Sequence, residues 1–375
     1  MDPEKGNLRV CLAHDWLVGL RGGEWVLDRL ACLYGPTTLY TLVNDGRFLT
    51  DAIADCEVLT SPLQRFPKAS GRWRRAYLPL MPWAVGRLKV KPCDLLVSTS
   101  SAVMKSIRPP DGAKHICYCH SPARYVWDQM DDYTQGSGGM FRSLGLRLVR
   151  TPLQRWDRKT ASRVDRFLAN SSHTARRIKA CYGREAVVVH PPVRTRRFTI
   201  ERSIEREDFY LVVAALEPYK RTELALEAAR KMGFKLTIAG GGTQFDRLKL
   251  IAPSNVTLSG RVSEDELLSL YRRAKALIFP QTEDFGIVPV EAQATGCPVI
   301  AFKKGGATET ITDATGVFFD QPEIDGLIEA IGIFEARSKG EEFTVEACRD
   351  NAQRFAEAVF DDAIRREVDI VMSKK

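Results

Sequence analysis

Short apolar runs alternate with helix-like segments along almost the whole chain, and this alternation limits the fold more than any other feature. A first series of strand-like runs comprises "LRVCLAHD", "DLLVSTS", "AKHICYCH", "VDRFLANS" and "AVVVHPPV". A second series comprises "FYLVVAAL", "FKLTIAG", "NVTLSG", "ALIFPQ" and "PVIAF". Segments with helical periodicity, such as "RGGEWVLDRLACLYG" and "YKRTELALEAARKMG", lie between them. Because strands joined by helices form parallel sheets, the sequence predicts two doubly wound, Rossmann-like α/β domains.

The boundary between the two domains is expected near "HPPVRTRRF", where paired prolines end a strand and cannot continue into a helix. A chain of 375 residues is too long for one hydrophobic core, and 44% hydrophobic residues are enough to fill two. We therefore predict a first domain over residues 1–195 and a second over 196–350. An amphipathic helix over about 351–375 is expected to pack back on the first domain.

Composition narrows the location and the partners. No apolar run approaches the roughly 20 residues that span a bilayer, and the charged start has no signal-peptide pattern, so a cytoplasmic protein is expected. Nine scattered cysteines indicate reduced thiols. The net charge of +8 divides into +13 for residues 1–195 and −5 for residues 196–375. The basic half favours a polyanion or an anionic surface as partner.

Two glutamates, Glu283 and Glu291, flank a short apolar segment after the strand-like run "ALIFP". In open parallel sheets, ligands bind beyond the carboxyl ends of the strands. A helix expected from about Val288 through Ala294 would present backbone N–H groups of "FGIVP", which form an anion site at a helix N-terminus. The spacing therefore suits a diphosphate flanked by two carboxylates that accept hydrogen bonds from sugar hydroxyls.

In this setting, "EDFGIVPVE" resembles the E-x7-E signature of retaining GT-B glycosyltransferases of family 4. The motifs "DWLVGLRGGEWVLDRL", "YCHSPARYVWD", "FLANSSHTARRI", "HPPV", "EPYKRTELALEA", "AGGG" and "GGATETI" follow in the order typical of the family's bacterial branch, so the resemblance covers nearly the whole chain. "HSPARYVWD" and "PYKR" are most similar to mannosyltransferases that build O-antigen and other cell-surface polysaccharides. The resemblance implies two Rossmann-like domains facing each other across a cleft, with the acceptor on the first and the nucleotide sugar on the second.

The resemblance also assigns roles to individual residues. It implies that Glu283 holds the donor hexose, that Glu291 binds the ribose and that His120 lies near the reacting end of the sugar. Lys220 is similar to the lysine that neutralises the departing diphosphate, which makes His120, Glu283 and Lys220 the expected catalytic set. Further donor contacts are implied for Gly22, Gly23, Arg221, Phe285, Gly286, Ile287 and Val288. Acceptor contacts are implied for Asp15, Arg124, Tyr125 and Trp127.

Two positions depart from the family pattern. Ala215 stands where many relatives have an arginine that helps to clamp the phosphates, so that one cation is missing or Arg221 supplies it. Arg194 stands in the linker where relatives often have an aspartate. The first departure bears on the phosphate site and the second on the hinge.

Neither a metal nor a cofactor is expected. On a strand, His115, Cys117 and Cys119 share one face, but no second ligand pair has zinc-like spacing, so core thiols are the favoured interpretation. The sequence has no D-x-D motif of the kind that holds a metal and a nucleotide. Alternatives on the same fold are a nucleotide-sugar epimerase, a phosphorylase with pyridoxal phosphate, for which no lysine motif appears, and a non-catalytic sugar-nucleotide-binding protein.

The basic excess is concentrated in residues 66–92, which carry seven Lys and Arg, no acidic residue and several large apolar side chains. This basic segment indicates either a solvated loop or attachment to anionic lipid at the inner face of the cytoplasmic membrane. No nucleic-acid recognition motif accompanies the charge. The expected partners are GDP-mannose or UDP-glucose as donor and a lipid-linked or glycan acceptor.

Overall fold

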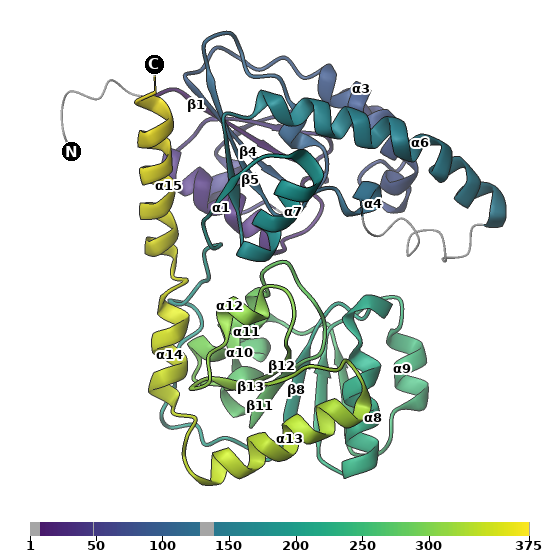
Figure 1. The fold of residues 1–375 in the computed structure, drawn as a ribbon, viewed down its shortest axis with the longest axis vertical. Coiled ribbons are helices and arrows are strands. Elements are labelled where there is room, and N and C mark those ends of the chain that lie inside the picture. Colours follow the sequence, from purple (N-terminus) through teal and green to yellow (C-terminus); the bar gives the residue numbers. More distant parts are fainter. Residues whose placement is uncertain (1–7, 48, 128–138, 375) are drawn as a thin grey trace. The chain divides into compact units, whose positions relative to one another are not determined.

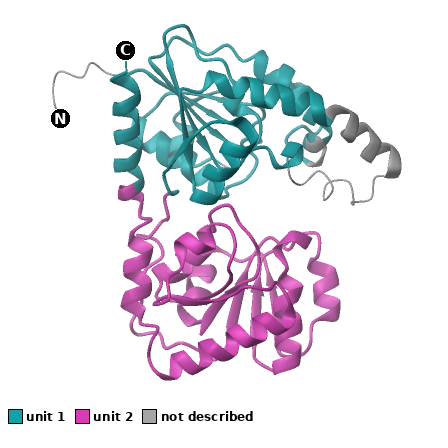
Figure 2. Cartoon of the chain, viewed as in Figure 1, with its two compact units in different colours: residues 1–191, 360–375 teal, residues 192–359 magenta. Residues whose placement is uncertain are grey.

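The structure is a computed structural model that describes residues 8–47, 49–127 and 139–374 (Figure 1). The chain divides into two compact units, which Figure 2 distinguishes by colour. Unit 1 comprises residues 1–191 and 360–375, and unit 2 comprises residues 192–359. Each unit is built on its own parallel sheet and is described by itself.

Unit 1 contains a seven-stranded parallel sheet with the order β3-β2-β1-β4-β5-β6-β7. Its central strands are buried on both faces, as expected for parallel strands covered by helices. The chain starts in the middle at β1, moves outward through β2 and β3, and then returns to the other side of β1 with β4. The strands are β1 (Val10–His14), β2 (Thr38–Thr41), β3 (Glu57–Thr60), β4 (Leu95–Ser100), β5 (Lys114–Cys119), β6 (Arg166–Ala169) and β7 (Ala186–Val188).

Alternate residues of β1 separate the two faces of this sheet. Leu12 packs with Leu27 of α1 and Phe360 of α15, whereas Ala13 packs with Met81 of α3 on the opposite face. The helices of unit 1 are α1 (Gly22–Tyr34), α2 (Asp51–Ala54), α3 (Met81–Gly86), α4 (Arg124–Trp127), α6 (Gly139–Thr160), α7 (Ser172–Tyr182) and α15 (Glu357–Met372, with its first residues in unit 2), joined by the 3-10 turns η1 (Pro62–Arg65), η2 (Arg72–Leu80), η3 (Met104–Ser106) and η4 (Ala161–Arg163).

Unit 2 contains a six-stranded parallel sheet with the order β10-β9-β8-β11-β12-β13. Its first strand again lies in the middle, so the chain builds one half of the sheet and then reverses direction at β11. The strands are β8 (Tyr210–Val213), β9 (Leu236–Ala239), β10 (Val256–Gly260), β11 (Ala276–Phe279), β12 (Val299–Phe302) and β13 (Gly316–Phe319).

Helices cover both faces of the second sheet as well. Tyr210 and Val212 of β8 pack towards α8, α9 and α13, whereas Leu211 packs towards α10 and α11. The helices are α8 (Thr222–Met232), α9 (Phe245–Ile251), α10 (Glu264–Arg273), α11 (Ile287–Ala294), α12 (Ala307–Thr310), α13 (Ile324–Lys339) and α14 (Val345–Gln353), with the 3-10 turn η5 (Pro218–Lys220) after β8. Two doubly wound, Rossmann-like units are thus present, and the predicted fold class is confirmed.

The C-terminal segment forms two helices rather than one. α14 packs on α11 of unit 2. The chain changes direction near Phe355, whose carbonyl accepts a hydrogen bond of 2.8 Å from the Val193 amide. α15 then packs on the first sheet through Phe360, and Glu367 forms an ion pair of 2.7 Å with Arg166 of β6. Both contacts of α15 lie within unit 1.

Candidate functional site

The loops after β8 and β11 diverge at the point where the strand order of unit 2 reverses. β8 is followed by β9 on one side of the sheet, and β11 lies on the other side of β8. A crevice between such loops is where open parallel sheets bind ligands. The loop after β8 carries Lys220 at the end of η5, and the loop after β11 carries Glu283.

Lys220 and Glu283 form an ion pair across this switch point. The Lys220 side chain is 13% exposed and the Glu283 side chain 21% exposed, so both can be reached from solvent. An anionic ligand at this place would compete with the Glu283 carboxylate for the ammonium group. A sugar hydroxyl could then donate to the carboxylate that the lysine leaves.

The backbone from Glu283 to Gly286 is held by close contacts with two glycines after β12. The Gly306 amide donates to the Glu283 carbonyl at 2.9 Å. A Cβ atom on Gly305 would lie 2.3 Å from that carbonyl oxygen, and one on Gly306 would lie 2.3 Å from the Phe285 Cα atom, so side chains at both positions are excluded. This contact explains the glycine pair of "GGATETI": it allows two loops of the ligand-binding edge to touch.

The loop enters α11 through Gly286, whose φ of +84° lies in the left-handed region that favours glycine. The Phe285 side chain is buried and packs against Phe355, with ring centroids 5.5 Å apart. Ile287 and Val288 are partly buried against the same core. The side chains of this loop thus serve packing, and its backbone is what a donor would contact.

Glu291 lies in the second turn of α11 and is only 7% exposed. Its carboxylate accepts a hydrogen bond of 3.2 Å from the Tyr271 hydroxyl of α10. Burial raises the pKa of Glu291 to about 7, against the opposing effects of the Arg194 charge and the Tyr271 hydrogen bond. Arg194 stands in the linker where relatives often have an aspartate. Its guanidinium group forms an ion pair of 2.7 Å with Glu264.

The raised pKa of Glu291 predicts a pH-dependent stability. Because the folded-state pKa lies above the ordinary value of 4.5, the folded chain binds the proton more tightly than the unfolded chain does. The wild type should therefore lose stability as the pH rises from about 4.5 to about 7. Glu291→Gln should remove this loss and be more stable than the wild type at pH 8, by up to about 3 kcal/mol.

Urea unfolding at pH 5 and pH 8 measures this effect. The control is Glu266→Gln, which changes an exposed carboxylate of the neighbouring helix α10. Its free energy of unfolding should differ from that of the wild type by the same amount at both pH values. An equal effect of Glu291→Gln at pH 5 and pH 8 would show that the buried carboxylate is not destabilising.

Arg221 has its guanidinium carbon 5.1 Å from the centre of the Phe302 ring, at the end of β12. Its φ of 53° places the residue in the left-handed region, between η5 and α8. Among the described residues, the buried Nη1 atom has no hydrogen-bond partner. Arg221 thus retains an unused donor near the loops of the switch point, and its predicted compensation for Ala215 stays a prediction.

The "AGGG" segment follows β9 and presses against the loop after β8. A Cβ atom on Gly240 would lie 1.8 Å from the Ala214 carbonyl oxygen, and one on Gly242 would lie 2.4 Å from that of Leu216. These glycines therefore have a steric role, which is to let the two loops approach each other closely.

In unit 1 the switch point lies between β1 and β4, and α1 begins beside it. Gly22 and Gly23 are the first residues of α1. A Cβ atom on Gly23 would lie 3.5 Å from His120 Nε2 and 3.7 Å from His14 Cε1. The structure thus brings together Gly23 and His120, two of the predicted site residues, within one unit.

His120 follows β5, and its backbone is fixed on both sides. Its amide donates to the Ser100 carbonyl at 2.8 Å, and its carbonyl accepts from Asn170 Nδ2 at 3.0 Å. The ring packs edge-on against Tyr118, with centroids 5.2 Å apart. These contacts hold the imidazole next to the N-terminus of α1.

Sequence reasoning missed a buried group of three residues, His14, Thr99 and Glu24, near Gly23 at the start of α1. His14 Nδ1 lies 2.6 Å from Thr99 Oγ1, and His14 Nε2 lies 3.9 Å from Glu24 Oε1. Glu24 also accepts from the Arg21 amide at 3.1 Å and so caps α1. Burial opposes ionisation of Glu24, but the contacts with His14 outweigh it and lower the pKa of this carboxyl. The polar pair "HD" at the end of a buried strand was the available signal.

Asp15 is 1% exposed, and its carboxylate is used within the fold. It accepts four backbone N–H bonds of 2.6 to 2.9 Å from the loop after β4. An acceptor hydroxyl would have to displace these bonds. We therefore replace the predicted acceptor contact of Asp15 by a structural role, which is to shape the loop at the first switch point.

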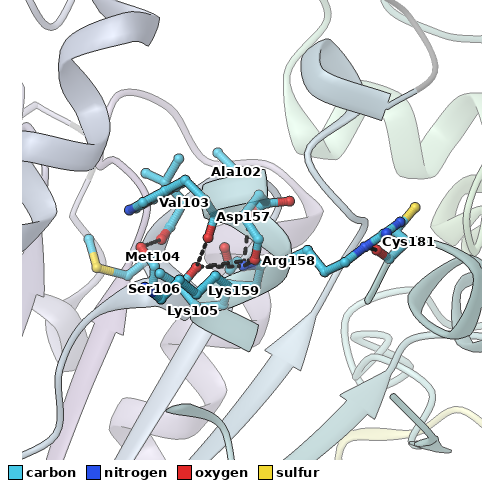
Figure 3. A network of polar contacts seen from close by, with 12 residues as sticks. Ala102, Val103, Met104, Lys105, Ser106, Asp157, Arg158, Lys159 and Cys181 are labelled. Atoms are coloured by element: carbon cyan, nitrogen blue, oxygen red, sulfur yellow. Dashed lines mark hydrogen bonds and ion pairs between the residues drawn. The ribbon is translucent and has the colours of Figure 1, made fainter. Parts of the chain in front are cut away.

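The same loop continues into a buried ion pair between Lys105 and Asp157 (Figure 3). Lys105 Nζ lies 2.8 Å from Asp157 Oδ1 and donates to the Asp157 carbonyl at 2.6 Å. Trp127 Nε1 donates to the other carboxylate oxygen at 2.8 Å, so this indole, for which an acceptor contact was predicted, anchors α4 to α6. Arg124 and Tyr125, also in α4, are partly exposed, and their acceptor contacts stay predictions.

The strand "HICYCH" has all of its alternating polar and thiol side chains in the core. His115 Nε2 lies 2.8 Å from Ser98 Oγ, and its Nδ1 lies 3.2 Å from the Arg163 carbonyl. Burial lowers the pKa of His115 to about 4, which keeps the ring neutral. Cys117 and Cys119 pack with Phe167 in the hydrophobic cluster beside α7. The two thiols thus lie in the hydrophobic core, which was the interpretation favoured from the sequence.

Two family descriptions match this chain, one for each unit. The family described as "Glycosyltransferase Family 4" matches residues 38–197, and the one described as "Glycosyl transferases group 1" matches residues 193–354. Two Rossmann-like units together with these two matches are characteristic of the GT-B fold of glycosyltransferases. The chain belongs to glycosyltransferase family 4, as the sequence motifs indicated.

Curated relatives match about half of the chain. The "GDP-mannose-dependent monoacylated alpha-(1-6)-phosphatidylinositol monomannoside mannosyltransferase" of Corynebacterium glutamicum is 31% identical over 204 residues, which are 46% of this chain and 54% of the relative. The "D-inositol 3-phosphate glycosyltransferase" of Mycobacterium tuberculosis is 29% identical over 202 residues, 47% of this chain and 42% of the relative. The matches therefore span about half the length of these relatives.

Solved structures match over nearly the full length. Sucrose-phosphate synthase from Thermosynechococcus elongatus has a TM-score of 0.74 and 14% identity, covering 98% of this chain and 100% of its own. Anabaena HepE in complex with UDP has a TM-score of 0.71 and 16% identity, covering 96% and 100%. At 14% and 16% sequence identity, this structural similarity shows the fold alone.

Proposed function

We propose that this protein transfers a hexosyl group from a nucleotide sugar to a lipid-linked or glycan acceptor, with retention of the anomeric configuration. GDP-mannose is the preferred donor, because the Corynebacterium relative is named as dependent on it. UDP-glucose is the second candidate, because HepE is described in complex with UDP-glucose. The observation that carries the proposal is the Lys220–Glu283 pair at the switch point of unit 2, with Glu291 buried in the helix that follows.

In the proposed reaction, the diphosphate binds where Lys220 can contact it, and Glu283 then accepts hydrogen bonds from the hexose hydroxyls. Glu291 accepts from the ribose hydroxyls, which favours its ionised form and adds a charged hydrogen bond of about 1.5 to 3 kcal/mol. The nucleoside diphosphate departs, the acceptor hydroxyl attacks the same face of the sugar, and the departing phosphate takes the proton.

We further propose that the reaction needs no metal ion and no cofactor. The charge that develops on the leaving diphosphate would be met by the Lys220 ammonium and by the backbone N–H groups at the start of α11. Arg221 has an unused Nη1 donor for the same purpose. His120 is proposed to stabilise positive charge at the anomeric carbon, next to the glycine pair of α1.

Thermal unfolding in the presence of nucleotides tests the donor. A ligand at about 100 times its dissociation constant adds roughly 2.7 kcal/mol of stability. GDP and GDP-mannose should raise the melting temperature of the wild type more than UDP and UDP-glucose do. The reverse order would assign a UDP-sugar donor, and no shift with any of the four would contradict a nucleotide-sugar site.

We propose that exposed side chains of the basic segment, residues 66–92, contact anionic lipid at the inner face of the cytoplasmic membrane. Leu80 and Trp83 are 40% and 43% exposed. The Arg87 guanidinium carbon lies 5.9 Å from the centre of the Trp83 ring, and Lys89 is exposed nearby in the chain. Within the described ranges, none of the helices has both the length and the apolar composition for crossing a bilayer.

Binding to vesicles tests this surface. Association with vesicles that contain phosphatidylglycerol should fall steeply between low and high salt, since each Lys or Arg near an anionic surface contributes about 1 kcal/mol. Trp83→Ala and the double change Arg87→Ala with Lys89→Ala should each weaken binding severalfold. The control, Lys235→Ala with Lys249→Ala, removes two exposed lysines of unit 2 and should leave binding unchanged. Salt-independent binding would argue against the electrostatic contact.

A further inference from the structure

Unit 2 has an open pocket of about 460 Å³ on the outer side of α10. Its other wall is the irregular, turn-containing segment over residues 196–204, which leads from the linker towards β8. The volume is within the range of about 300 to 1,000 Å³ that holds small ligands. The pocket is lined by Arg196, Arg197, Thr199, Ile204, Asp265, Leu268, Ser269 and Arg272.

This pocket is separate from the carboxylate that is proposed to bind the ribose. Tyr271 of α10 is fully buried and donates to Glu291. The next residue, Arg272, lines the pocket. Successive side chains of a helix point about 100° apart, so the two residues leave α10 on different faces.

The pocket carries more positive than negative charge. Arg197 is paired with Asp265, and its Nε lies 3.9 Å from Glu264. Arg272 donates to the Thr199 carbonyl and hydroxyl, both at 2.9 Å. Its charge also interacts with the exposed carboxylate of Glu201, but within the described residues it forms no ion pair with a carboxylate. Arg196 is exposed and makes no side-chain hydrogen bond or ion pair among the described residues.

The remaining lining residues complement these guanidinium groups. The hydroxyls of Thr199 and Ser269 can bind polar oxygens, and Ile204 and Leu268 provide an apolar wall. The nearby carboxylate of Glu201 is engaged by the Ser203 hydroxyl at 2.8 Å. Guanidinium groups suit phosphate oxygens because they offer several N–H donors in a fixed planar fork.

We propose that this pocket binds a phosphate monoester on a small organic body, such as a sugar phosphate, at a site distinct from the donor site. The phosphate would contact Arg196 and Arg272, and the organic body would lie against Ile204 and Leu268. Arg197 would keep its ion pair with Asp265 at the edge of the pocket. The proposal stands on the pocket alone and does not require the glycosyl transfer reaction.

Isothermal titration calorimetry with mannose 6-phosphate tests the site, with GDP present at saturation so that the nucleotide site is filled. The wild type should bind the sugar phosphate, and mannose without phosphate should bind at least about tenfold more weakly. Inorganic phosphate should also bind more weakly, because it lacks the organic body. Arg196→Ala should reduce the affinity for mannose 6-phosphate by about tenfold or more.

The matched control is Arg202→Ala, which removes an exposed arginine of the same chain segment that pairs with Glu346 at 3.0 Å outside the pocket. Its affinity for mannose 6-phosphate should equal that of the wild type, as should that of Glu291→Ala. Equal affinity of the wild type and a folded Arg196→Ala protein would overturn the proposal. So would the absence of binding by the wild type, or loss of binding when GDP is added.

Discussion

Replacing Lys220 by alanine is expected to lower kcat for glycosyl transfer by about 10² to 10³, the scale for one group that stabilises transition-state charge. The ammonium group is proposed to meet the charge that grows on the departing diphosphate, so its effect should appear in kcat more than in the donor KM. In the free protein, the same ammonium neutralises Glu283. Steady-state kinetics over a range of donor concentrations separates the two parameters.

Two further variants make the Lys220 result interpretable. Lys220→Arg keeps the positive charge beside Glu283 and should retain more activity than Lys220→Ala. Lys231→Ala removes an exposed lysine near the end of α8, paired with Asp325 at 3.2 Å, and should have wild-type kinetics. A rise in KM at unchanged kcat in Lys220→Ala would mean that the lysine only binds the donor's ground state.

The His120→Ala variant is expected to lose about 10² to 10³ in turnover while its affinity for nucleoside diphosphate stays near that of the wild type. The reason is the proposed contact between the imidazole and the anomeric carbon as positive charge develops there. The backbone carbonyl of His120 is the alternative contact, but it already accepts from Asn170 Nδ2 at 3.0 Å. The side chain is therefore the favoured group.

Asn170→Ala discriminates between the imidazole and the carbonyl. It frees the His120 carbonyl without removing the imidazole, so it should change turnover far less than His120→Ala does. Single-turnover transfer, alongside calorimetry with nucleoside diphosphate, measures both quantities. Full activity in a folded His120→Ala protein would exclude the side chain from the reaction.

The fold could be predicted from the sequence wherever a strand was a distinct apolar run. All ten runs quoted for the two series coincide with strands, but β2, β3 and β13 were not identified. β3 lies at the edge of its sheet and has no buried residue, so its sequence "EVLT" shows little apolar signal. β2 and β13 are no shorter than several strands that were identified, so length does not explain why they were missed. Each follows a segment of turn-forming residues, "GPT" before β2 and "TDAT" before β13.

The single C-terminal helix expected from the sequence is interrupted in the structure, for a different reason. Its amphipathic pattern runs through Phe355, yet the structure has a break between α14 and α15 at this residue. The side chain of Phe355 is buried against Phe285, and its carbonyl pairs with the Val193 amide. This tertiary contact replaces a helical hydrogen bond, and periodicity along one segment carries no information about it.

The sequence allows residues that belong to a motif to be named as site candidates, whereas it gives no signal for buried polar partners. Glu283, Lys220 and the α1 glycines were identified because their spacing matches a family pattern. Lys105 and Asp157 lie 52 positions apart and meet only in the folded unit. The family resemblance implied an acceptor contact for Asp15, but the sequence does not show that four backbone amides surround its carboxylate.

The most direct test of the central claim is a single-turnover transfer assay with the purified protein. GDP carrying radiolabelled mannose is incubated with bacterial membrane lipids as acceptor, and a parallel reaction contains UDP-glucose. Label should move from GDP-mannose into the lipid fraction, with one GDP released for each mannose transferred and an α-linkage retained in the product. Nucleotide binding without transfer from either donor to any lipid or glycan acceptor would contradict the proposed glycosyl transfer and would indicate a protein that only binds sugar nucleotides.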